Sequence, residues 1–517
     1  MAALMWVGYA ERTLRADELC HALAVQLGSN DFNGQNIPSI WTLVDCCQGL
    51  ITVEEETSTV RLTHLTVKEY LSTRPDIFGR PHAVMAEICL TYLNSKQVAD
   101  LSADASASIH DKPFLGYCSI YWGVHAKREL SNSARSLALE LFREYNGHIS
   151  SKLLLEQVEH QTRLNPHSYF VKYHGRDSSS SFSGLHCASF FGIVDLVAAL
   201  IEMGCYNINE RDTRGSNPLA WAARNGHEEV VKMLLQRREV CPDQSDYSGL
   251  TPLSHAAWEG HGEVVKMLLE QPKVYPDKPD DNGRTPLSYA SQGGHEMVVK
   301  ILLELADVSP EGPGHWGQTP ISYAAQSGHE GVVKILLELV GVSPDRQSDI
   351  GQTPLSYAAQ GGHEGVVQIL LSRKEVDPGK PDHDGMTPLA YAACYGHEAI
   401  VKMLLAREEV NPDQPTTFGE TPLLYAARYG RKEVVEILLG REEVMPDRPD
   451  EWGRTPLSNA AENGHQEAVR ILLGRKEVNP GRLDEDGKTP LIYAVSNSHK
   501  EVVALLEAHQ LLPPSPT

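Results

Sequence analysis

Apolar and small side chains recur in one fixed order along the second part of the chain. In the stretch 353–371, TPLSYAAQGGHEGVVQILL, Thr353 and Pro354 suit the N-cap and the first position of a helix, and the leucine and alanines that follow share one helical face. Gly362 can end that helix in the left-handed conformation. The Val-Val and Leu-Leu pairs beyond it repeat at the four-residue spacing of a buried helical stripe. The pattern predicts a short helix, a tight turn and a longer helix.

The same unit returns every 34 residues. Its Thr-Pro dipeptide starts at Thr251, Thr285, Thr319, Thr353, Thr387, Thr421, Thr455 and Thr489. Two earlier units, around Ser183 and Asn217, keep this register, so the sequence holds about ten units between residues 179 and 511. A period of 34 residues also suits tetratricopeptide repeats, and the residue columns rather than the period distinguish the two folds.

These columns resemble the ankyrin repeat, whose signature is T-P-L-H-x-A-A-x-x-G-H-x-x-V-V-x-x-L-L. Nine units match it well, and the first, SGLHCASFFGIVDLVAALIEMG, matches more loosely. The histidine of the T-P-L-H tetrapeptide is usually Ser, Ala, Leu or Ile here, and each unit is one residue longer than the commonest form. The resemblance implies a mostly α fold, a solenoid of about ten 34-residue units that bury their faces against one another.

The first 180 residues do not repeat. RADELCHALAVQLG and NIPSIWTLVDCCQ show helical spacing, and GLITVEEETSTVRLTH alternates apolar and polar residues on both sides of a polar turn. Helices followed by a β-hairpin predict a winged helix at residues 1–80. TVKEYLST and the segments after it return to helical spacing, which predicts a helical spacer and linker at 81–178. The repeats at 179–511 and a disordered tail at 512–517 complete the division.

The amino-acid sequence of this N-terminal region resembles that of a known domain arrangement. ADELCHALAV, NIPSI and LVDCCQGLITVEEETSTVRLTHLTVKEYL are similar to the winged helix that follows the NACHT nucleotide-binding module in fungal NACHT–ankyrin proteins. CLTYLN and PFLGYCSIYWGVHAK resemble the helical spacer of those proteins. The resemblance implies a role in a NOD-like-receptor type of signalling. However, the sequence contains no G-x-x-x-x-G-K-[ST] phosphate-binding loop, so no ATPase is predicted for it.

The formal net charge of −22 argues against a nucleic-acid partner, because phosphate binding depends on Lys and Arg. The winged helix does not change this expectation, since residues 1–80 hold six basic and ten acidic residues. Nine cysteines without CxxC pairs indicate a reducing compartment, and we expect a cytoplasmic protein with the nucleus left open. The apolar start lacks a basic segment and is read as a helix, not a signal peptide. No apolar run is long enough for a membrane span.

Three features of the repeats suggest chemistry, and each has a structural interpretation that we favour. The Thr-Pro pairs look like phosphorylation sites but suit buried N-caps. One histidine recurs at the same position in most repeats. Successive histidines are one repeat apart, which is too far for them to bind the same metal ion, and we expect their rings to form hydrogen bonds with backbone groups. Five residues separate Gly481 and Gly487, where a phosphate-binding loop needs four. We predict no catalytic residue, no cofactor and no metal site.

Aromatic and arginine positions are the candidates for binding. A tyrosine column follows Thr-Pro and could serve as core or as the wall of a concave groove. The positions that vary most lie at the turn tips and at the end of the first helix of each unit, and aromatic and Arg side chains there are typical interface anchors. The candidate set is Arg224, Tyr247, Trp258, Trp316, Tyr395, Phe418, Arg428, Tyr429 and Trp452.

The sequence therefore predicts a non-enzymatic protein–protein interaction scaffold or ligand sensor, whose partner it does not identify. By resemblance, the pathway is of the fungal NOD-like-receptor type. The alternative is a regulatory part of a NACHT ATPase switch, acting on a nucleotide-binding module in the same or another chain. A transcription regulator is disfavoured by charge, and whether Met1 is the native start stays open.

Overall fold

The computed structural model describes residues 1–29, 31–74, 77–101, 111–163 and 182–510. The chain divides into two units: unit 1 is Met1–Ala256 with Glu263–Tyr275, and unit 2 is Ala257–Gly262 with Pro276–Thr517. The described residues are mostly helical, and their strands form one two-stranded sheet, which confirms the mostly α fold. Within the spacer and linker expected at 81–178, residues 102–110 and 164–178 lie outside the described residues, as does the tail expected at 512–517.

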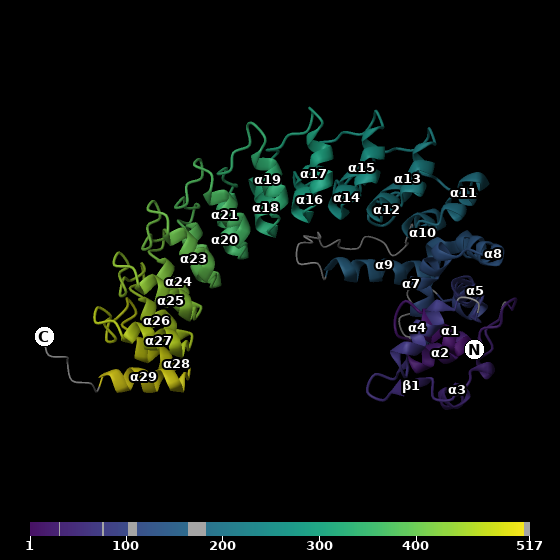
Figure 1. The fold of residues 1–517 in the computed structure, drawn as a ribbon, viewed down its shortest axis with the longest axis horizontal. Helices are drawn as coiled ribbons and strands as arrows, with labels where there is room; N and C mark the ends of the chain where they lie inside the picture. Colours follow the sequence, from purple (N-terminus) through teal and green to yellow (C-terminus); the bar gives the residue numbers. More distant parts are fainter. Residues whose placement is uncertain (30, 75–76, 102–110, 164–181, 511–517) are drawn as a thin grey trace. The chain divides into compact units, whose positions relative to one another are not determined.

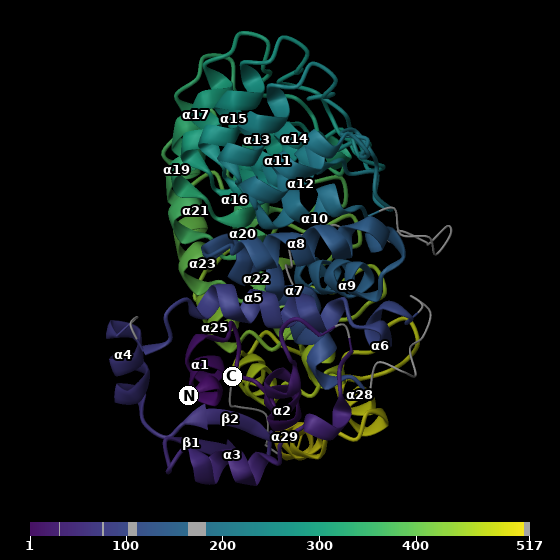
Figure 2. The ribbon, with the colours of Figure 1, turned by 90° about the vertical axis from the view of Figure 1, so that its right-hand side faces the viewer.

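The N-terminal part of unit 1 has the predicted order of helices and a hairpin. Its elements are α1 (Ala2–Tyr9), α2 (Ala16–Ala24), the 3-10 turn η1 (Gly34–Asn36), α3 (Ile40–Cys46), β1 (Ile51–Glu54), β2 (Thr59–Leu62) and α4 (Leu65–Thr73). The strands are antiparallel with Val53 opposite Val60, and Val60 is buried against the helices. Figure 2 shows the hairpin between α3 and α1. The winged-helix prediction is confirmed.

A helical segment follows in the same unit. It comprises α5 (Pro81–Leu93), α6 (Lys96–Ala99), α7 (Pro113–Arg128), α8 (Asn132–Leu141), the 3-10 turn η3 (Phe142–Gly147) and α9 (Ile149–Arg163). Helix α5 packs along α7, and α2 also packs on α7. The indole of Trp6 in α1 meets the rings of Phe114 and Tyr117 in α7 edge-on, with centroids 5.4 and 5.7 Å away. The winged helix and the spacer thus share one aromatic core.

Ten helix pairs make up the repeats. The first helices are α10 (Gly184–Phe191), α12 (Pro218–Arg224), α14 (Pro252–Glu259), α16 (Pro286–Gly293), α18 (Pro320–Ser327), α20 (Pro354–Gly361), α22 (Pro388–Tyr395), α24 (Pro422–Arg428), α26 (Pro456–Glu462) and α28 (Pro490–Ser496). The second helices are α11 (Val194–Met203), α13 (Glu228–Leu235), α15 (Gly262–Leu269), α17 (Glu296–Leu303), α19 (Glu330–Leu337), α21 (Glu364–Leu371), α23 (Glu398–Leu405), α25 (Lys432–Leu439), α27 (Gln466–Leu473) and α29 (Lys500–Gln510). A 3-10 turn, η4 (His315–Gly317), precedes α18.

Within unit 2, successive pairs from α16–α17 to α28–α29 lie side by side in chain order (Figure 1). The reason is visible in any one pair. The Thr353 hydroxyl accepts a hydrogen bond from the backbone N–H of Ser356 and starts α20, while Gly362 ends it at φ 77°. The alanines of α20 and the valines of α21 are fully buried, so each pair needs its neighbours to cover its apolar faces. The repeat interpretation is confirmed.

Candidate interaction surface

The loop before several of the first helices is held by one carboxylate. Asp280 accepts hydrogen bonds at Oδ1 from the backbone N–H groups of Asn282 and Arg284, both at 2.8 Å, and at Oδ2 from the hydroxyl of Tyr289 at 2.5 Å. The same brace joins four further pairs: Trp221–Asp212, His255–Asp246, Tyr391–Asp382 and Tyr493–Asp484. Each of these loops is therefore tied to the helix that follows it.

Burial decides whether the tyrosine column belongs to the core or to a groove wall. Tyr289, Tyr323 and Tyr357 are buried, and Tyr391 and Tyr425 are half-buried. Burial raises the pKa of the Tyr289 hydroxyl, which stays protonated and serves as a donor. The column belongs to the core rather than to an open groove wall. An aspartate stands nine residues before Tyr289, Tyr391 and Tyr493, and hydrophobic patterning does not reveal this pairing.

Two of the four turn-tip candidates, Tyr247 and Trp452, stand on loops held by an aspartate, Asp246 and Asp450. Tyr247 in unit 1 and Trp316, Phe418 and Trp452 in unit 2 expose 44% to 55% of their surface. The rings of Phe418 and Trp452, in adjacent repeats, stack with centroids 5.9 Å apart and planes 18° apart. The backbone N–H of Glu451 donates to the Phe418 oxygen at 3.0 Å, which fixes the two tips relative to each other. The structure thus brings two of the four turn-tip candidates together.

Trp316 sits differently. It has a left-handed backbone conformation, φ 55°, within the turn η4, and its indole lies 4.3 Å from the ring of His315. Its backbone oxygen accepts a hydrogen bond from the N–H of Asp349 in the next repeat at 2.7 Å. The exposed indole is therefore presented by a tight, braced turn.

The candidates at the ends of the first helices fall into two groups. Tyr395 and Tyr429 each expose 47% of their surface. Arg224, Trp258 and Arg428 are half-buried and already engaged. Arg224 lies over the Trp221 ring at 5.6 Å, and the Trp258 ring lies 4.7 Å from that of Tyr289.

Arg428 is the most firmly held of these side chains. Its Nη2 donates to the Glu420 carboxylate at 2.5 Å, and its Nε donates to Asn459 Oδ1 at 2.9 Å in the next repeat. Its guanidinium also lies over the Tyr425 ring at 5.5 Å. Arg428 therefore contributes to packing between repeats, and the exposed anchors of the candidate set are aromatic.

The histidine column serves the backbone, as expected. In each of seven histidines, Nε2 bonds the backbone oxygen of the residue 37 positions earlier, at 2.8 to 3.1 Å: His227, His295, His329, His363, His397, His465 and His499. In the unit that has Arg431 in place of histidine, the arginine Nε donates to the Cys394 oxygen at 3.0 Å. The column is a staple between repeats. The arginine substitute was not foreseen.

Two other tempting motifs are ordinary parts of the repeat. Seven Thr hydroxyls accept from the N–H three residues on, at Thr251, Thr285, Thr353, Thr387, Thr421, Thr455 and Thr489. In the segment that resembles a phosphate-binding loop, Asp484 Oδ1 accepts from the backbone N–H of Lys488 at 2.8 Å. Its Oδ2 accepts from Tyr493, so this segment is the braced loop of the last unit.

Comparison with protein families agrees with this geometry. A family model described as ankyrin repeats (3 copies) matches residues 185–280, 272–348, 338–414, 374–447, 405–482 and 442–511. Together these matches cover more than half of the chain. The chain belongs to the ankyrin-repeat family. A second model, described as GPI inositol-deacylase, winged helix domain, matches residues 1–77 of this ankyrin-repeat protein.

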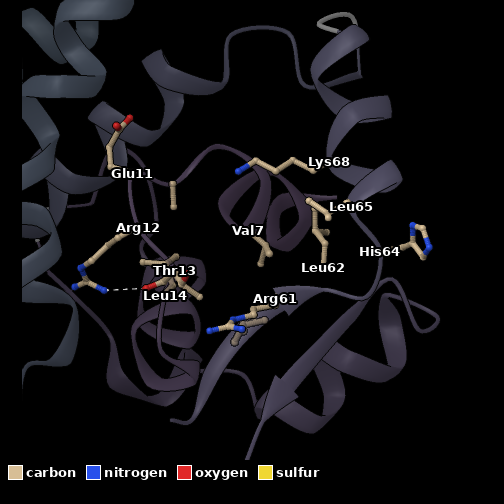
Figure 3. A pocket seen from close by; sticks show the side chains of 12 residues that line it. Val7, Glu11, Arg12, Thr13, Leu14, Arg61, Leu62, His64, Leu65 and Lys68 are labelled. Atoms are coloured by element: carbon tan, nitrogen blue, oxygen red, sulfur yellow. Dashed lines mark hydrogen bonds between the residues drawn. The ribbon is translucent and has the colours of Figure 1, made fainter.

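The winged-helix part holds a cavity of about 340 Å³ between α1, the segment after it, β2 and α4 (Figure 3). Its wall is apolar at Val7, Leu62 and Leu65 and charged at Arg61 and Lys68. Arg12, which also lines it, donates to both oxygens of Glu18 at 2.8 and 2.6 Å, and this contact raises the pKa of the guanidinium. Glu11 supplies the one carboxylate among its twelve lining residues. Paired carboxylates are therefore not assembled there.

None of the helices in the described ranges is long and apolar enough to cross a bilayer.

Proposed function

We propose that this ankyrin-repeat protein is a non-enzymatic interaction scaffold that recognises protein partners through aromatic side chains at its turn tips. The observation that carries the proposal is the Phe418–Trp452 stack. Two large rings are exposed in adjacent repeats although burying them would be favourable. Their loops are fixed by hydrogen bonds from the backbone N–H of Phe418 to the Thr416 hydroxyl and from that of Trp452 to the Asp450 carboxylate. A rigid, exposed aromatic pair loses little conformational entropy on binding, which is the property of an interface anchor.

The proposed binding set is the candidate set named above, with the exposed members Tyr247, Trp316, Tyr395, Tyr429 and the stacked pair making contact. Half-buried Arg224, Trp258 and Arg428 hold the surface in place. We assign partner recognition to the repeats at residues 179–511. The winged helix (1–80), the spacer and linker (81–178) and the tail (512–517) are assigned no contact with the partner. The acidic net charge favours neither nucleic acid nor anionic membrane as partner. Unpaired cysteines are in keeping with a cytoplasmic location.

The test compares full-length protein with a double variant, Phe418→Ser with Trp452→Ser. Tyr275→Ser is the matched control, because Tyr275 is also an exposed aromatic on a repeat loop but lies outside the candidate set. Proteins crosslinked to each form in cells are quantified by mass spectrometry. We expect the double variant to lose a group of partners that wild type and control retain. Equal recovery from all three forms would contradict the aromatic anchor.

The second candidate function is the regulatory part of a NACHT ATPase switch in a fungal NOD-like-receptor type of pathway. The winged-helix match at residues 1–77 is the observation that favours it, together with the resemblance of this segment to NACHT–ankyrin proteins. Its test is to mix the chain with NACHT modules, once with an intact phosphate-binding loop and once with its lysine replaced. Complex formation that depends on ATP and on that lysine supports the switch. Binding that does not depend on nucleotide, or no binding at all, would contradict the switch and leave the scaffold as the proposed function.

A further inference from the structure

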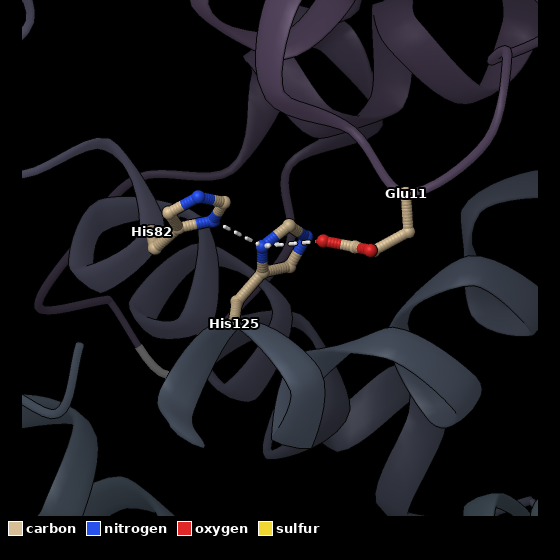
Figure 4. Close-up of side chains that lie close together, drawn as sticks. All are labelled: Glu11, His82 and His125. Atoms are coloured by element: carbon tan, nitrogen blue, oxygen red, sulfur yellow. Dashed lines mark hydrogen bonds and ion pairs between the residues drawn. The ribbon is translucent and has the colours of Figure 1, made fainter. Parts of the chain in front are cut away.

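Three metal-ligating side chains meet in unit 1, away from the repeats (Figure 4). Glu11 follows α1, His82 lies in the first turn of α5, and His125 lies near the end of α7. They meet because α5 packs along α7 while α1 packs on α5. The Nδ1 atoms of the two rings are 2.9 Å apart, and His125 Nδ1 is 3.8 Å from Glu11 Oε1.

We propose that Glu11, His82 and His125 bind a divalent transition-metal ion of the zinc type. Zinc takes imidazole nitrogen and carboxylate oxygen at about 2.0–2.2 Å, so two ligand atoms of a tetrahedral site lie roughly 3.3 Å apart. The observed separations of 2.9 and 3.8 Å lie on either side of this value. An ion between the three side chains therefore needs only small shifts of each. Two imidazoles and one carboxylate form a ligand set that zinc prefers.

The groups behind these ligands hold them in place. His125 Nε2 lies 2.8 Å from the Tyr117 hydroxyl, which also accepts the backbone N–H of Glu11 at 3.1 Å. Glu11 Oε2 accepts from Arg128 at 3.0 Å. Such outer hydrogen bonds orient metal ligands and fix which ring nitrogen faces the ion.

An ion could enter from one side. A cavity of about 300 Å³ is lined by Gly8, Tyr9, Ala10, Lys68, Leu71 and Arg128 together with the ligands Glu11 and His82. His125 closes the opposite side, since its side chain is fully buried. Three protein ligands with an open fourth position are typical of zinc sites that hold water or a small ligand.

The same three side chains can also be held together by hydrogen bonds without a metal ion. One Nδ1 can donate a hydrogen bond to the other, and Arg128 alone can hold the Glu11 carboxylate. Arg128 also lies 3.5 Å from His82 Nε2, and its charge opposes a second cation. We therefore expect weaker binding than in a closed site with four protein ligands. Arg128 donates to both Glu11 oxygens, from Nη1 to Oε1 and from Nη2 to Oε2, so metal binding requires Nη1 to give up Oε1.

The experiment uses the full chain after removal of metal by chelator dialysis. Zn²⁺ is titrated in competition with a chelating dye, and Co²⁺ is added separately because its visible spectrum reports ligand type and geometry. The variants are His82→Gln and Glu11→Gln, and His160→Gln is the control, a histidine exposed on α9 outside the cluster. Thermal unfolding without metal shows that each variant is folded.

We expect one ion per chain, with a tetrahedral Co²⁺ spectrum free of thiolate absorption. Each ligand variant should weaken binding about tenfold or more, and His160→Gln should leave it unchanged. Absence of stoichiometric binding, a thiolate spectrum from the exposed cysteines, or variants that bind like wild type would show that the rings are joined only by their hydrogen bond. If His82→Gln fails to fold, Glu11→Gln and the wild-type Co²⁺ spectrum decide between the same outcomes.

Discussion

Arg431 donates a hydrogen bond from Nε to the backbone oxygen of Cys394 at 3.0 Å, the contact that histidine makes in the repeats on either side. The aliphatic part of Arg431 also lies over Gly396, where His397 lies over Gly362 one repeat earlier. Two unlike side chains therefore perform one task, which is to satisfy a carbonyl of the preceding repeat. The column is defined by this bond and not by imidazole chemistry.

Replacing Arg431 tests this equivalence. Arg431→His should change the free energy of unfolding little, because the imidazole can reach the same oxygen. Arg431→Ala should destabilise by about 1–3 kcal/mol, since the carbonyl loses its partner at a repeat interface. Urea unfolding followed by circular dichroism measures both. Similar losses in the two variants would mean that packing of the arginine stem, rather than the hydrogen bond, matters.

The braced loop offers a matched pair of tyrosines. Tyr289→Phe removes a hydrogen bond to the charged Asp280 and should cost about 1.5–3 kcal/mol. Tyr323 is similarly buried, but its hydroxyl faces Gly314, which has no side chain to accept its bond. Tyr323→Phe should therefore cost clearly less. The midpoints of thermal unfolding give the comparison, and equal losses would contradict a stabilising role for the brace.

The repeat was predictable because each recurring position has a local structural role that its residue type indicates. Thr353 caps a helix, Gly362 ends it, and the valine and leucine pairs keep one period over ten units. Exposed aromatics such as Trp452 were also found, since they interrupt columns that are otherwise regular. These inferences need only neighbours along the chain or one repeat away.

Pairings outside the repeat could not be found in this way. His82 and His125 are 43 residues apart on helices of unequal length, and Glu11 is further still. Only the packing of α5 along α7 brings them together, and no period in the sequence encodes it. Arg428 was expected at the surface, but its bonds to Glu420 and Asn459 depend on loop geometry that hydrophobic patterning does not determine.

Two glycines of the repeat region distinguish the free-energy cost of a left-handed backbone from the cost of a steric clash with a neighbouring side chain. Gly341 has φ 96°, and a Cβ there would meet no atom within 4 Å, so Gly341→Ala should cost only the left-handed conformation, about 1 kcal/mol. Gly328 has φ 79°, and a Cβ there would lie 2.5 Å from the His363 ring. Gly328→Ala should cost more, because the ring must leave its hydrogen bond to Gln326. Chemical denaturation compares the two, and a ranking in the opposite order would exclude this contact as the reason for glycine.

Acid should destabilise unit 1 through its buried histidines. The His148 ring bonds Ser150 through Nδ1 and the Leu93 oxygen through Nε2, and burial lowers its pKa to about 4. An unfolded histidine titrates near 6.5. Between these values the unfolded chain binds a proton that the folded ring does not. The stability is therefore complete above about pH 6.5 and falls as the pH drops toward 4, by about 2 kcal/mol at pH 5.

Thermal unfolding from pH 7 to pH 5, followed by tryptophan fluorescence, measures this loss, because Trp6 and Trp122 are buried in unit 1. His148→Gln removes the titrating group and should flatten the dependence. Part of it should remain, since burial also lowers the pKa of His125, to about 3. The exposed His160, replaced by Gln, should leave the wild-type dependence intact. A His148→Gln curve parallel to wild type would show that other groups carry the acid sensitivity.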